Sequence, residues 1–314
     1  MRFNRFGFLI GAAVATLTLT GPALAQQLDR SESDDGRGLY ASATKGVSGT
    51  MVKAFAGTGV ALPDSGIAAE SAEDVWALWA LEPKSAPLGR ESIIGTDDRV
   101  LIKNTKKFPA SAMVLITFEN SRCTGWMIGA DTVATAGHCV HSGGSSGRWY
   151  QRNTYRIYPG RNGNASPYGS CTAKRLYSVN GWTKNGRDDF DYGAIKLNCT
   201  VGNTGGWLGF FWESTSLNGL PTIISGYPGD KPLTQWRSKG KVTVTQQRRV
   251  FYRNDTVGGM SGSAVYYNRT GCGNCAMAIH AYGTYGSPPF SKNNHGTRIV
   301  KAVFDNLIKW RNAP

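Results

Sequence analysis

The sequence predicts an all-β body that ends in one amphipathic helix. After residue 92, short apolar or alternating runs recur, and clusters of Gly, Asn and Ser separate them. The 40 glycines among 314 residues suit a chain with many tight turns. Near the end the apolar residues recur at helical spacing instead, at Ile299, Val300, Val303, Phe304, Leu307 and Ile308. We therefore expect a C-terminal helix that packs on the β-body.

Residues 1–25 have the features of a secretory signal peptide. Arg2 and Arg5 give a positive start, residues 6–20 form an apolar stretch, and Ala-Leu-Ala at 23–25 is a small-residue cleavage site. An uncleaved membrane anchor is the alternative, which the threonines, the glycines and Pro22 in this stretch disfavour. We expect a secreted protein, extracellular or periplasmic, with no membrane contact after cleavage.

Residues 26–91 differ in composition from the rest and are predicted to be a propeptide. They carry 6 Lys and Arg against 10 Asp and Glu, whereas residues 92–314 carry 27 against 11. Ser71 and Asp74 resemble a capping box ahead of an apolar face that contains Trp76 and Trp79. Because one helix has no core of its own, we expect it to dock on the body. A disordered linker is the alternative.

Residues 92–314 are predicted to form one domain. Strands are expected at 113–118, 193–197, 222–225, 241–246 and 264–267. This length suffices for one large β-domain with two cores. Its basic residues are scattered and no nucleic-acid motif is present, so we expect a solvated basic surface that attracts acidic proteins and binds no nucleic acid.

The cysteines agree with export. They form an even set, which in an exported chain favours disulfides, with 15 pairings allowed in principle. The CxxC pair of Cys272 and Cys275 has the alternative of half a zinc site or a redox motif. A second CxxC is missing and His280 is the one histidine near it, so a disulfide-closed hairpin is preferred. The six residues are Cys123, Cys139, Cys171, Cys199, Cys272 and Cys275.

Two segments supply a base and a group that orients it. TAGHC at 135–139 carries His138, whose imidazole titrates near ~6.5 and can take up and return a proton. DYGAIKL at 191–197 begins with Asp191, directly before an apolar run with the character of a buried strand. Its neighbours Asp188 and Asp189 are rivals for the role. A structural histidine and a solvated acidic loop are the plainer explanations of these segments.

The third segment, GGMSGSAV at 258–265, supplies the nucleophile. A serine hydroxyl needs a base within hydrogen-bonding reach, and that base needs a third group to fix its tautomer. Glycines around Ser261 let the backbone bend sharply, and the N–H groups of Gly259 and Ser261 are expected to form an oxyanion hole. A flexible Gly/Ser loop is the plainer explanation. The joint occurrence of all three segments in the order His, Asp, Ser favours a catalytic triad.

These segments resemble the trypsin-like superfamily, and specifically its bacterial glutamyl endopeptidase branch, the V8-protease type. The similarity runs from Ile-Ile-Gly at 93–95 through Cys-Thr-Gly at 123–125 to the C-terminal helix. It implies a chymotrypsin-like double six-stranded β-barrel with the triad in the cleft between the barrels. It also implies a monomer that hydrolyses protein or peptide substrates through an acyl-enzyme, with no metal or organic cofactor. The expected disulfides are Cys123–Cys139, Cys171–Cys199 and Cys272–Cys275.

Substrate preference is inferred from the same resemblance. The V8-type branch binds a glutamate side chain with a histidine and a threonine, which His280 and Thr256 match here. Both side chains can donate to a carboxylate. Asp255 opposes this, because it stands six residues before Ser261, the offset at which trypsin carries the acid that binds Lys or Arg. We expect preference for Glu, or Asp; a Lys/Arg preference and a catalytically inactive secreted binding homologue are the alternatives.

The resemblance also implies a zymogen. It places the mature start near Ser92, directly after Glu91. A glutamate-specific enzyme would cut there itself. In the V8-type branch the freed amino terminus helps to neutralise the substrate carboxylate, so Ser92 or Ile93 is expected to take that role.

Overall fold

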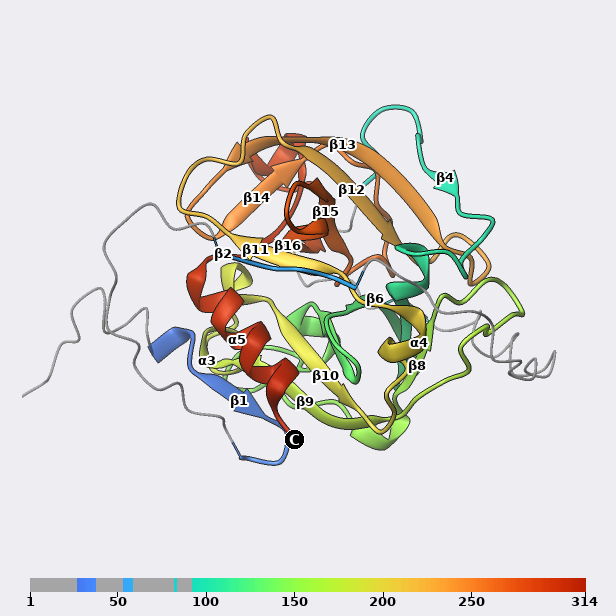
Figure 1. Ribbon diagram of the computed structural model, residues 1–314. Helices are drawn as coiled ribbons and strands as arrows, with labels where there is room; N and C mark the ends of the chain where they lie inside the picture. Colours follow the sequence, from blue (N-terminus) through green and yellow to red (C-terminus); the bar gives the residue numbers. More distant parts are fainter. Residues whose placement is uncertain (1–26, 38–52, 59–81, 84–91) are drawn as a thin grey trace, which may run out of the picture.

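The computed structural model describes residues 27–37, 53–58, 82–83 and 92–314. Two β-sheets and a C-terminal helix form the body (Figure 1). The predicted signal peptide, the predicted helix after Ser71, and Glu91 lie outside the described residues.

Six strands from the first half of the body form the first sheet. In spatial order they are β9 (Ala173–Val179), β10 (Gly193–Leu197), β7 (Thr132–Thr135), β6 (Ser121–Met127), β5 (Met113–Phe118) and β8 (Arg156–Pro159), with antiparallel neighbours throughout. An isolated bridge from Ile157 to Cys171 links the two ends of this path. Every residue of β5, β6, β7 and β10 is buried, so these strands form the core of the sheet.

Six strands from the second half close into a barrel. The order is β15 (Ala264–Arg269), β12 (Pro221–Gly226), β13 (Trp236–Thr245), β14 (Arg249–Tyr252), β17 (Asn294–Arg298) and β16 (Gly273–Tyr282). A further pairing of β15 with β16 joins the first strand to the last. Closure removes the exposed edges that an open sheet would leave.

The expected chymotrypsin-like architecture is therefore confirmed, with one closed six-stranded barrel and a second six-stranded unit whose ends are linked by an isolated bridge. Further strands make both sheets larger than six. β1 (Ser31–Ser33) and β3 (Glu82–Pro83) bring the first sheet to eight, through pairing with β9 and β6. β2 (Lys53–Phe55), β4 (Val100–Leu101) and β11 (Gly209–Trp212) bring the second to nine. Three of these added strands come from the segment predicted to be a propeptide.

The C-terminal helix is present as α5 (Lys301–Asn312). Its buried face consists of Val303, Phe304, Leu307 and Trp310, with Asn306 among them. Figure 1 shows it lying across the outside of the strands, where it contacts β7, β10 and β11. The spacing of three and four residues thus placed the apolar side chains on one face, as expected.

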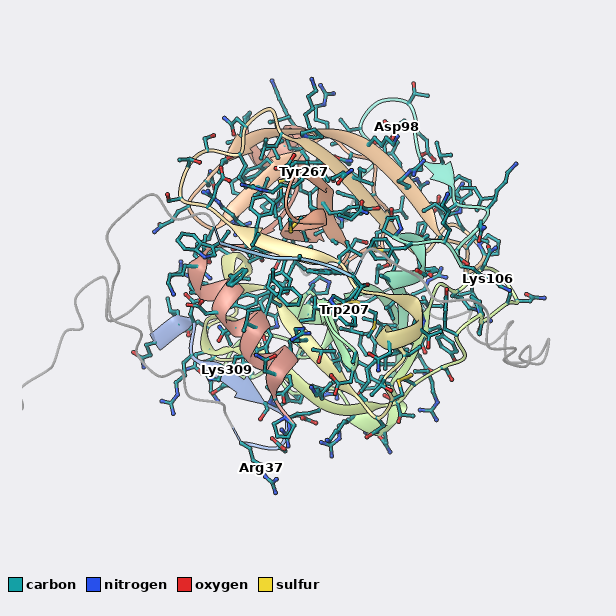
Figure 2. All side chains as sticks on the ribbon, viewed as in Figure 1. Arg37, Asp98, Lys106, Trp207, Tyr267 and Lys309 are labelled. Carbon is teal, nitrogen blue, oxygen red and sulfur yellow. A yellow bond between two sulfur atoms is a disulfide. The ribbon has the colours of Figure 1, made fainter. Side chains whose placement is uncertain are left out.

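Short helical turns connect the strands. They are α3 (Asn180–Thr183), α4 (Gly202–Gly205), η1 (Ala110–Ala112), η2 (Gly137–Cys139), η3 (Arg152–Thr154), η4 (Asp188–Phe190) and η5 (Phe290–Lys292). Across the described ranges, no helix is both long and apolar enough to cross a membrane. Charged side chains such as Arg37 and Lys106 point outward on different sides of the molecule (Figure 2).

Three disulfides join the six cysteines in the expected pairs, Cys123–Cys139, Cys171–Cys199 and Cys272–Cys275. The first joins β6 to η2, and the second ties the segments that precede β9 and follow β10. The third closes the turn between β15 and β16, so Cys272 and Cys275 are not available as zinc or redox thiols in this state.

Candidate active site

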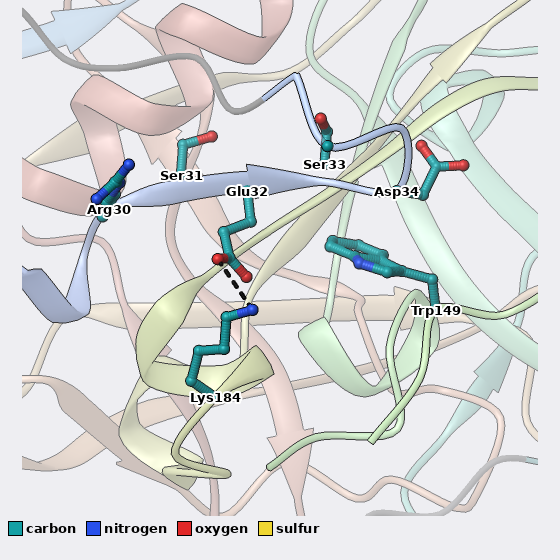
Figure 3. Close-up of a pocket in the computed structure, with 8 residues that line it drawn as sticks. Arg30, Ser31, Glu32, Ser33, Asp34, Trp149 and Lys184 are labelled. Carbon is teal, nitrogen blue, oxygen red and sulfur yellow. Dashed lines mark ion pairs between the residues drawn. The ribbon is translucent and has the colours of Figure 1, made fainter. Parts of the chain in front are cut away.

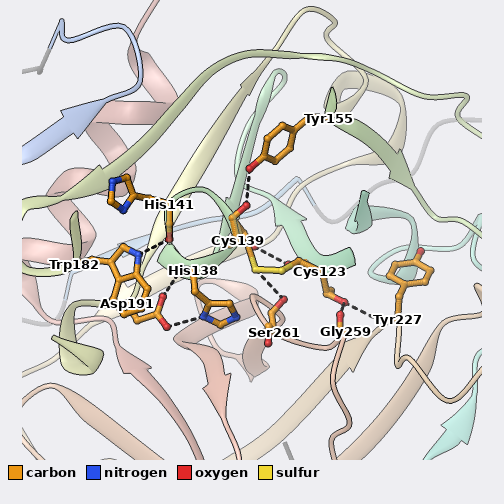
Figure 4. Close-up of a disulfide and its surroundings, with 12 residues drawn as sticks. Cys123, His138, Cys139, His141, Tyr155, Trp182, Asp191, Tyr227, Gly259 and Ser261 are labelled. Atoms are coloured by element: carbon orange, nitrogen blue, oxygen red, sulfur yellow. Dashed lines mark hydrogen bonds and ion pairs between the residues drawn. A yellow bond between two sulfur atoms is a disulfide. The ribbon is translucent and has the colours of Figure 1, made fainter. Parts of the chain in front are cut away.

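His138 lies in the tight turn η2 that follows β7. Its predecessor must be glycine, because a Cβ at Gly137 would come within 2.9 Å of both the Asp191 carboxylate and the Trp182 ring. The next residue, Cys139, is bonded to Cys123 on β6, and its carbonyl accepts a hydrogen bond of 2.8 Å from the Tyr155 hydroxyl. The backbone on both sides of His138 is thus held in place (Figure 4).

Asp191 is fully buried, two residues before β10, and makes two hydrogen bonds with His138. One carboxylate oxygen accepts the His138 backbone N–H at 2.7 Å, and the other lies 2.7 Å from Nδ1. In the neutral imidazole tautomer that donates Nδ1–H to this carboxylate, Nε2 keeps its lone pair. This is the tautomer in which an imidazole can act as a base through Nε2.

The two rival carboxylates are directed elsewhere. Asp188 pairs with Arg249 and accepts a hydrogen bond of 3.1 Å from the Tyr285 hydroxyl. Asp189 pairs with Arg187 at 3.0 Å. Among the three neighbouring acids, Asp191 is the one whose carboxylate contacts His138.

The loop that carries Ser261 is bent in a way that only glycine allows. Gly259 has a φ of +100°, and a Cβ there would lie 2.7 Å from the Tyr227 carbonyl oxygen. Gly262 has a φ of +88°, and a Cβ there would collide with the Thr124 backbone. L-residues rarely adopt such φ values, which explains the glycines around the serine.

Thr124 fixes this loop to the first sheet. Its hydroxyl donates to the Gly259 carbonyl at 2.8 Å, and its backbone N–H donates to the Ser261 carbonyl at 2.8 Å. The Ser261 carbonyl also lies 3.8 Å from Cys139 Sγ. Figure 4 shows the His138 ring between Asp191 and Ser261. The histidine and aspartate lie next to strands of the first sheet and the serine next to a strand of the second, and the serine loop lies against the turn that carries the histidine.

His280 and Thr256 border the serine loop and are both fully buried. The His280 carbonyl accepts the Gly262 N–H at 2.7 Å, and its Nδ1 lies 2.7 Å from the Tyr252 hydroxyl. Burial, together with the charge of nearby His138, lowers the pKa of His280 to about 3, so the ring is neutral near pH 7. Within the described part of the chain, Thr256 Oγ1 has no hydrogen-bond partner. A buried hydroxyl without a partner in the protein is suited to hydrogen bonding with a polar group of a bound substrate.

Asp255, which precedes Thr256, is not a free carboxylate. One oxygen accepts the Ile94 N–H at 2.7 Å and the other accepts the Asp98 N–H at 2.8 Å. Its side chain is 1% exposed. Asp255 therefore holds residues 94–98 against the second barrel, and the offset of six residues from Ser261 gives it no role in binding a basic side chain.

Ser92 lies beside Thr256. Its carbonyl accepts hydrogen bonds from the Thr256 N–H at 3.3 Å and from Asn294 Nδ2 at 2.6 Å. Its N–H donates to Asn294 Oδ1 at 3.0 Å, and its hydroxyl pairs with that of Thr284 at 2.9 Å. Asn294, Thr284 and Tyr252 were not predicted, because each lies far from its partner in the sequence and none belongs to a local motif.

The described residues contain one group of three side chains with the spacing of a metal site: Cys123, His138 and Cys139. The two sulfur atoms are bonded to each other, and His138 Nδ1 is bound to Asp191. A disulfide offers no thiolate, and the thiolate is the form in which cysteine binds a metal. This group belongs to the histidine turn and is not a metal site in this redox state.

Comparison with known proteins agrees with this geometry. The family described as Trypsin matches residues 102–300. A glutamyl endopeptidase of Bacillus licheniformis is 43% identical over 270 residues, which is 84% of this chain and 80% of that protein. A Bacillus subtilis protein named extracellular metalloprotease is 40% identical over 240 residues, 74% of each chain. The solved structure of a Glu endopeptidase in complex with MPD superposes with a TM-score of 0.64 and 29% identity, covering 70% of this chain and all of that one.

Proposed function

Because the chain belongs to the trypsin family and is a serine endopeptidase of the glutamyl endopeptidase-like type, we propose that His138, Asp191 and Ser261 are its catalytic triad. The observation that supports this most strongly is the double contact of Asp191 with His138, at 2.7 Å for each hydrogen bond. It orients the ring and fixes the proton on Nδ1. From its family we infer that the enzyme hydrolyses protein and peptide substrates.

The reaction proceeds through an acyl-enzyme. Ser261 Oγ attacks the scissile carbonyl carbon while His138 Nε2 takes its proton, and Asp191 stabilises the imidazolium that forms. The developing oxyanion is bound by the N–H groups of Gly259 and Ser261, in the loop bent by the positive φ of Gly259. His138 then donates the proton to the leaving amine, and water, activated by the same nitrogen, hydrolyses the ester.

We propose preference for glutamate before the scissile bond, with aspartate as a poorer substrate. Thr256 contributes a buried hydroxyl, and His280 a neutral imidazole. If the Tyr252 hydroxyl donates to Nδ1 of His280, Nε2 carries the hydrogen and can donate to a carboxylate. The relatives named glutamyl endopeptidase support this choice. The alternative preference for Lys or Arg depended on Asp255 alone. Both oxygens of that carboxylate accept backbone N–H groups, so it is not available to bind a basic side chain.

We further propose secretion as a zymogen: residues 1–25 are the signal peptide, 26–91 the propeptide and 92–314 the monomeric enzyme. Ser92 lies against Thr256 by backbone hydrogen bonding, so a cut after Glu91 would free an amino group close to the bound glutamate. A relative named extracellular agrees with export. N-terminal sequencing of the secreted protein should find Ser92 first; a start outside residues 91–95 would refute this boundary.

Two assays test the enzyme and its preference separately. A fluorophosphonate should label the matured wild-type chain and leave Ser261→Ala unlabelled; a folded wild-type protein that resists the label would favour an inactive binding homologue. Peptides that differ only in Glu, Gln, Asp or Lys before the cut then measure preference.

The His280→Ala variant tests the pocket. It should lower kcat/KM for the Glu peptide by about 100-fold, the order expected for a buried charge-assisted hydrogen bond, and erase the advantage of Glu over Gln. His141→Ala makes the same change at a buried histidine outside the pocket, and should leave the Glu-to-Gln ratio as it is. An unchanged ratio in His280→Ala would contradict the assignment.

A further inference from the structure

Residues 27–37, here called the anchor segment, lie along the outer edge of the first sheet. Their strand β1 pairs antiparallel with β9, in the register Ser31 to Val179. Two flanking backbone hydrogen bonds lengthen the ladder, from Asn180 N–H to the Arg30 carbonyl and from Asp34 N–H to the Leu176 carbonyl. Leu28 is buried in the main core. The segment thus supplies an edge strand to the first sheet. No local sequence pattern predicts this strand.

Asp29 is inserted into a socket on the body. Arg248 donates to both of its carboxylate oxygens, at 3.0 and 2.7 Å, and the Tyr192 hydroxyl donates at 2.9 Å. The Asp29 carbonyl accepts from Asn306 Nδ2 at 2.9 Å. The side chains of Arg248 and Asp29 are only 14% and 10% exposed. A buried guanidinium with a bidentate carboxylate partner is a strong and geometrically specific contact.

This socket is built on the loop that carries the catalytic aspartate. Tyr192 follows Asp191 directly, and Arg248 Nε donates to the Asp189 carbonyl at 3.2 Å. The Arg248 guanidinium also lies 3.8 Å from the centre of the Phe190 ring. Trp310 of α5 adds a hydrogen bond of 2.8 Å from Nε1 to Ser31 Oγ.

Each of the other acidic side chains of the segment also meets a basic group of the body. Glu32 pairs with Lys184 at 3.4 Å, beside an open cavity of about 280 Å³ that the segment forms with Trp149 and Lys184 (Figure 3). The remaining two pairs are Asp34 with Arg152 at 3.3 Å and Asp35 with Arg175 at 2.8 Å. This matches the opposite net charges of residues 26–91 and 92–314.

We propose that the anchor segment stays bound after the chain is cut ahead of Ser92, so that the mature enzyme carries a site for an acidic extended peptide at the edge of β9. This proposal depends on the proposed function in one respect, namely that maturation cuts the chain ahead of Ser92. Release would expose the edge of β9 and leave Arg248, Tyr192 and Trp310 without their acceptors on the segment, which costs free energy. Glu32 lies within the β ladder, which protects the bond after it from a protease that cuts at glutamate.

The test uses the full chain with Ser261→Ala, so that released segments are not digested. Sites for an unrelated protease are introduced at residues 40–45 and 86–91, which separates the anchor segment from β2 and β3 without relying on self-cleavage. After the cut, gel filtration and native mass spectrometry should find the fragment that contains residues 27–37 still bound to the body. Elution of that fragment apart from the body would overturn the proposal, whatever the fate of the self-maturation hypothesis.

Two alanine substitutions test which side chains of the anchor segment hold it on the body. Asp29→Ala should weaken retention at least about tenfold, because it removes both carboxylate acceptors of the largely buried Arg248 guanidinium and the acceptor of the Tyr192 hydroxyl. Glu32→Ala removes a carboxylate from the same segment. Its partner Lys184 is 62% exposed, and its other partner, the Thr183 hydroxyl, keeps a hydrogen bond to the Val179 carbonyl, so the loss should stay within about threefold. If one of these variants fails to fold, synthetic peptides of residues 27–37 that carry the same substitutions give the same comparison. Each peptide then competes with the wild-type segment for binding to the body. Equal losses of affinity for the two substitutions would contradict the role given to the contact between Asp29 and Arg248.

Discussion

Gly259 illustrates how one backbone position determines what the serine loop can do. Its φ of +100° is a conformation that L-residues rarely adopt, and its missing Cβ leaves room for the Tyr227 carbonyl. We expect Gly259→Ala to lower kcat by at least about 100-fold, the effect of losing one oxyanion donor. Steady-state hydrolysis of the Glu peptide measures this.

Gly219→Ala is the matched control for this change. Gly219 also has a positive φ, of +81°, but a Cβ there meets nothing within 4 Å. It therefore imposes similar backbone strain away from the site and should leave kcat within about twofold, with a small loss of stability. Equal effects of the two alanines on kcat would show that backbone strain alone, and not the oxyanion geometry, explains the loss.

At single residues, the sequence identifies candidates where the chemistry is contained in a local motif. His138, Asp191 and Ser261 stand in such segments, and the structure brings Asp191 onto His138. Asp255 was ambiguous, because an offset along the chain does not fix the direction of a side chain. Its partners, Ile94 and Asp98, are more than 150 residues away in the sequence. Asn294 was missed for the same reason, since its contact with Ser92 spans 202 positions.

Among the elements, η2 depends on the disulfide that joins Cys139 to β6. Replacing Cys123 and Cys139 by alanine opens a loop with a sequence separation of 16, for which chain entropy predicts a loss of about 3 kcal/mol. Because His138 precedes Cys139, kcat should fall as well. Urea unfolding and hydrolysis rates measure the two effects.

The pair Cys272 and Cys275 is the control for this element. Its separation is only 3, so the same chain-entropy relation predicts a loss of about 1.6 kcal/mol. The turn it closes lies at the opposite end of β15 from Ser261, so kcat should not change. A larger effect on kcat from this pair than from Cys123 and Cys139 would contradict the role given to η2.

Strands with a periodic apolar pattern were predictable, and strands without one were not. The expected runs at 113–118 and 193–197 coincide with β5 and β10. β1 has the sequence Ser-Glu-Ser, which has no apolar alternation. It becomes a strand because β9 offers a free edge and the body offers basic partners, and neither condition is visible within a short window.

For the whole molecule, three buried histidines should make stability depend on pH. Burial lowers the pKa of His141 to about 4, of His280 to about 3 and of His295 to about 2. In the unfolded chain an imidazole titrates near ~6.5, so the unfolded state takes up protons first as the pH falls. The stabilisation is therefore complete above about 6.5 and is lost progressively below it, by up to about 1.4 kcal/mol per pH unit for each histidine.

Denaturant unfolding of Ser261→Ala at pH about 7, 6 and 5 measures this slope while avoiding self-digestion. His295 is surrounded by aromatic rings, and its ring stacks on Tyr282 with centroids 5.2 Å apart. His295→Phe should therefore keep the packing and reduce the slope by about one third. A free energy of unfolding that is flat or rises toward pH 5 would show that these histidines are not held neutral.

The chymotrypsin-like arrangement of two six-stranded units followed from the resemblance of three short segments, and the structure has that architecture. What the sequence did not reveal is how far residues before Ser92 take part in it. The three strands β1, β2 and β3 extend the two sheets by pairing across long sequence separations. Such pairing is decided by edges that exist only once the rest of the chain has folded.

The most direct test of the whole account is to map the bonds that the matured protein cuts in a denatured proteome. We predict cuts after Glu, fewer after Asp, and none with an equal amount of Ser261→Ala. Cuts that cluster after Lys or Arg, or cutting that persists in Ser261→Ala, would contradict the account.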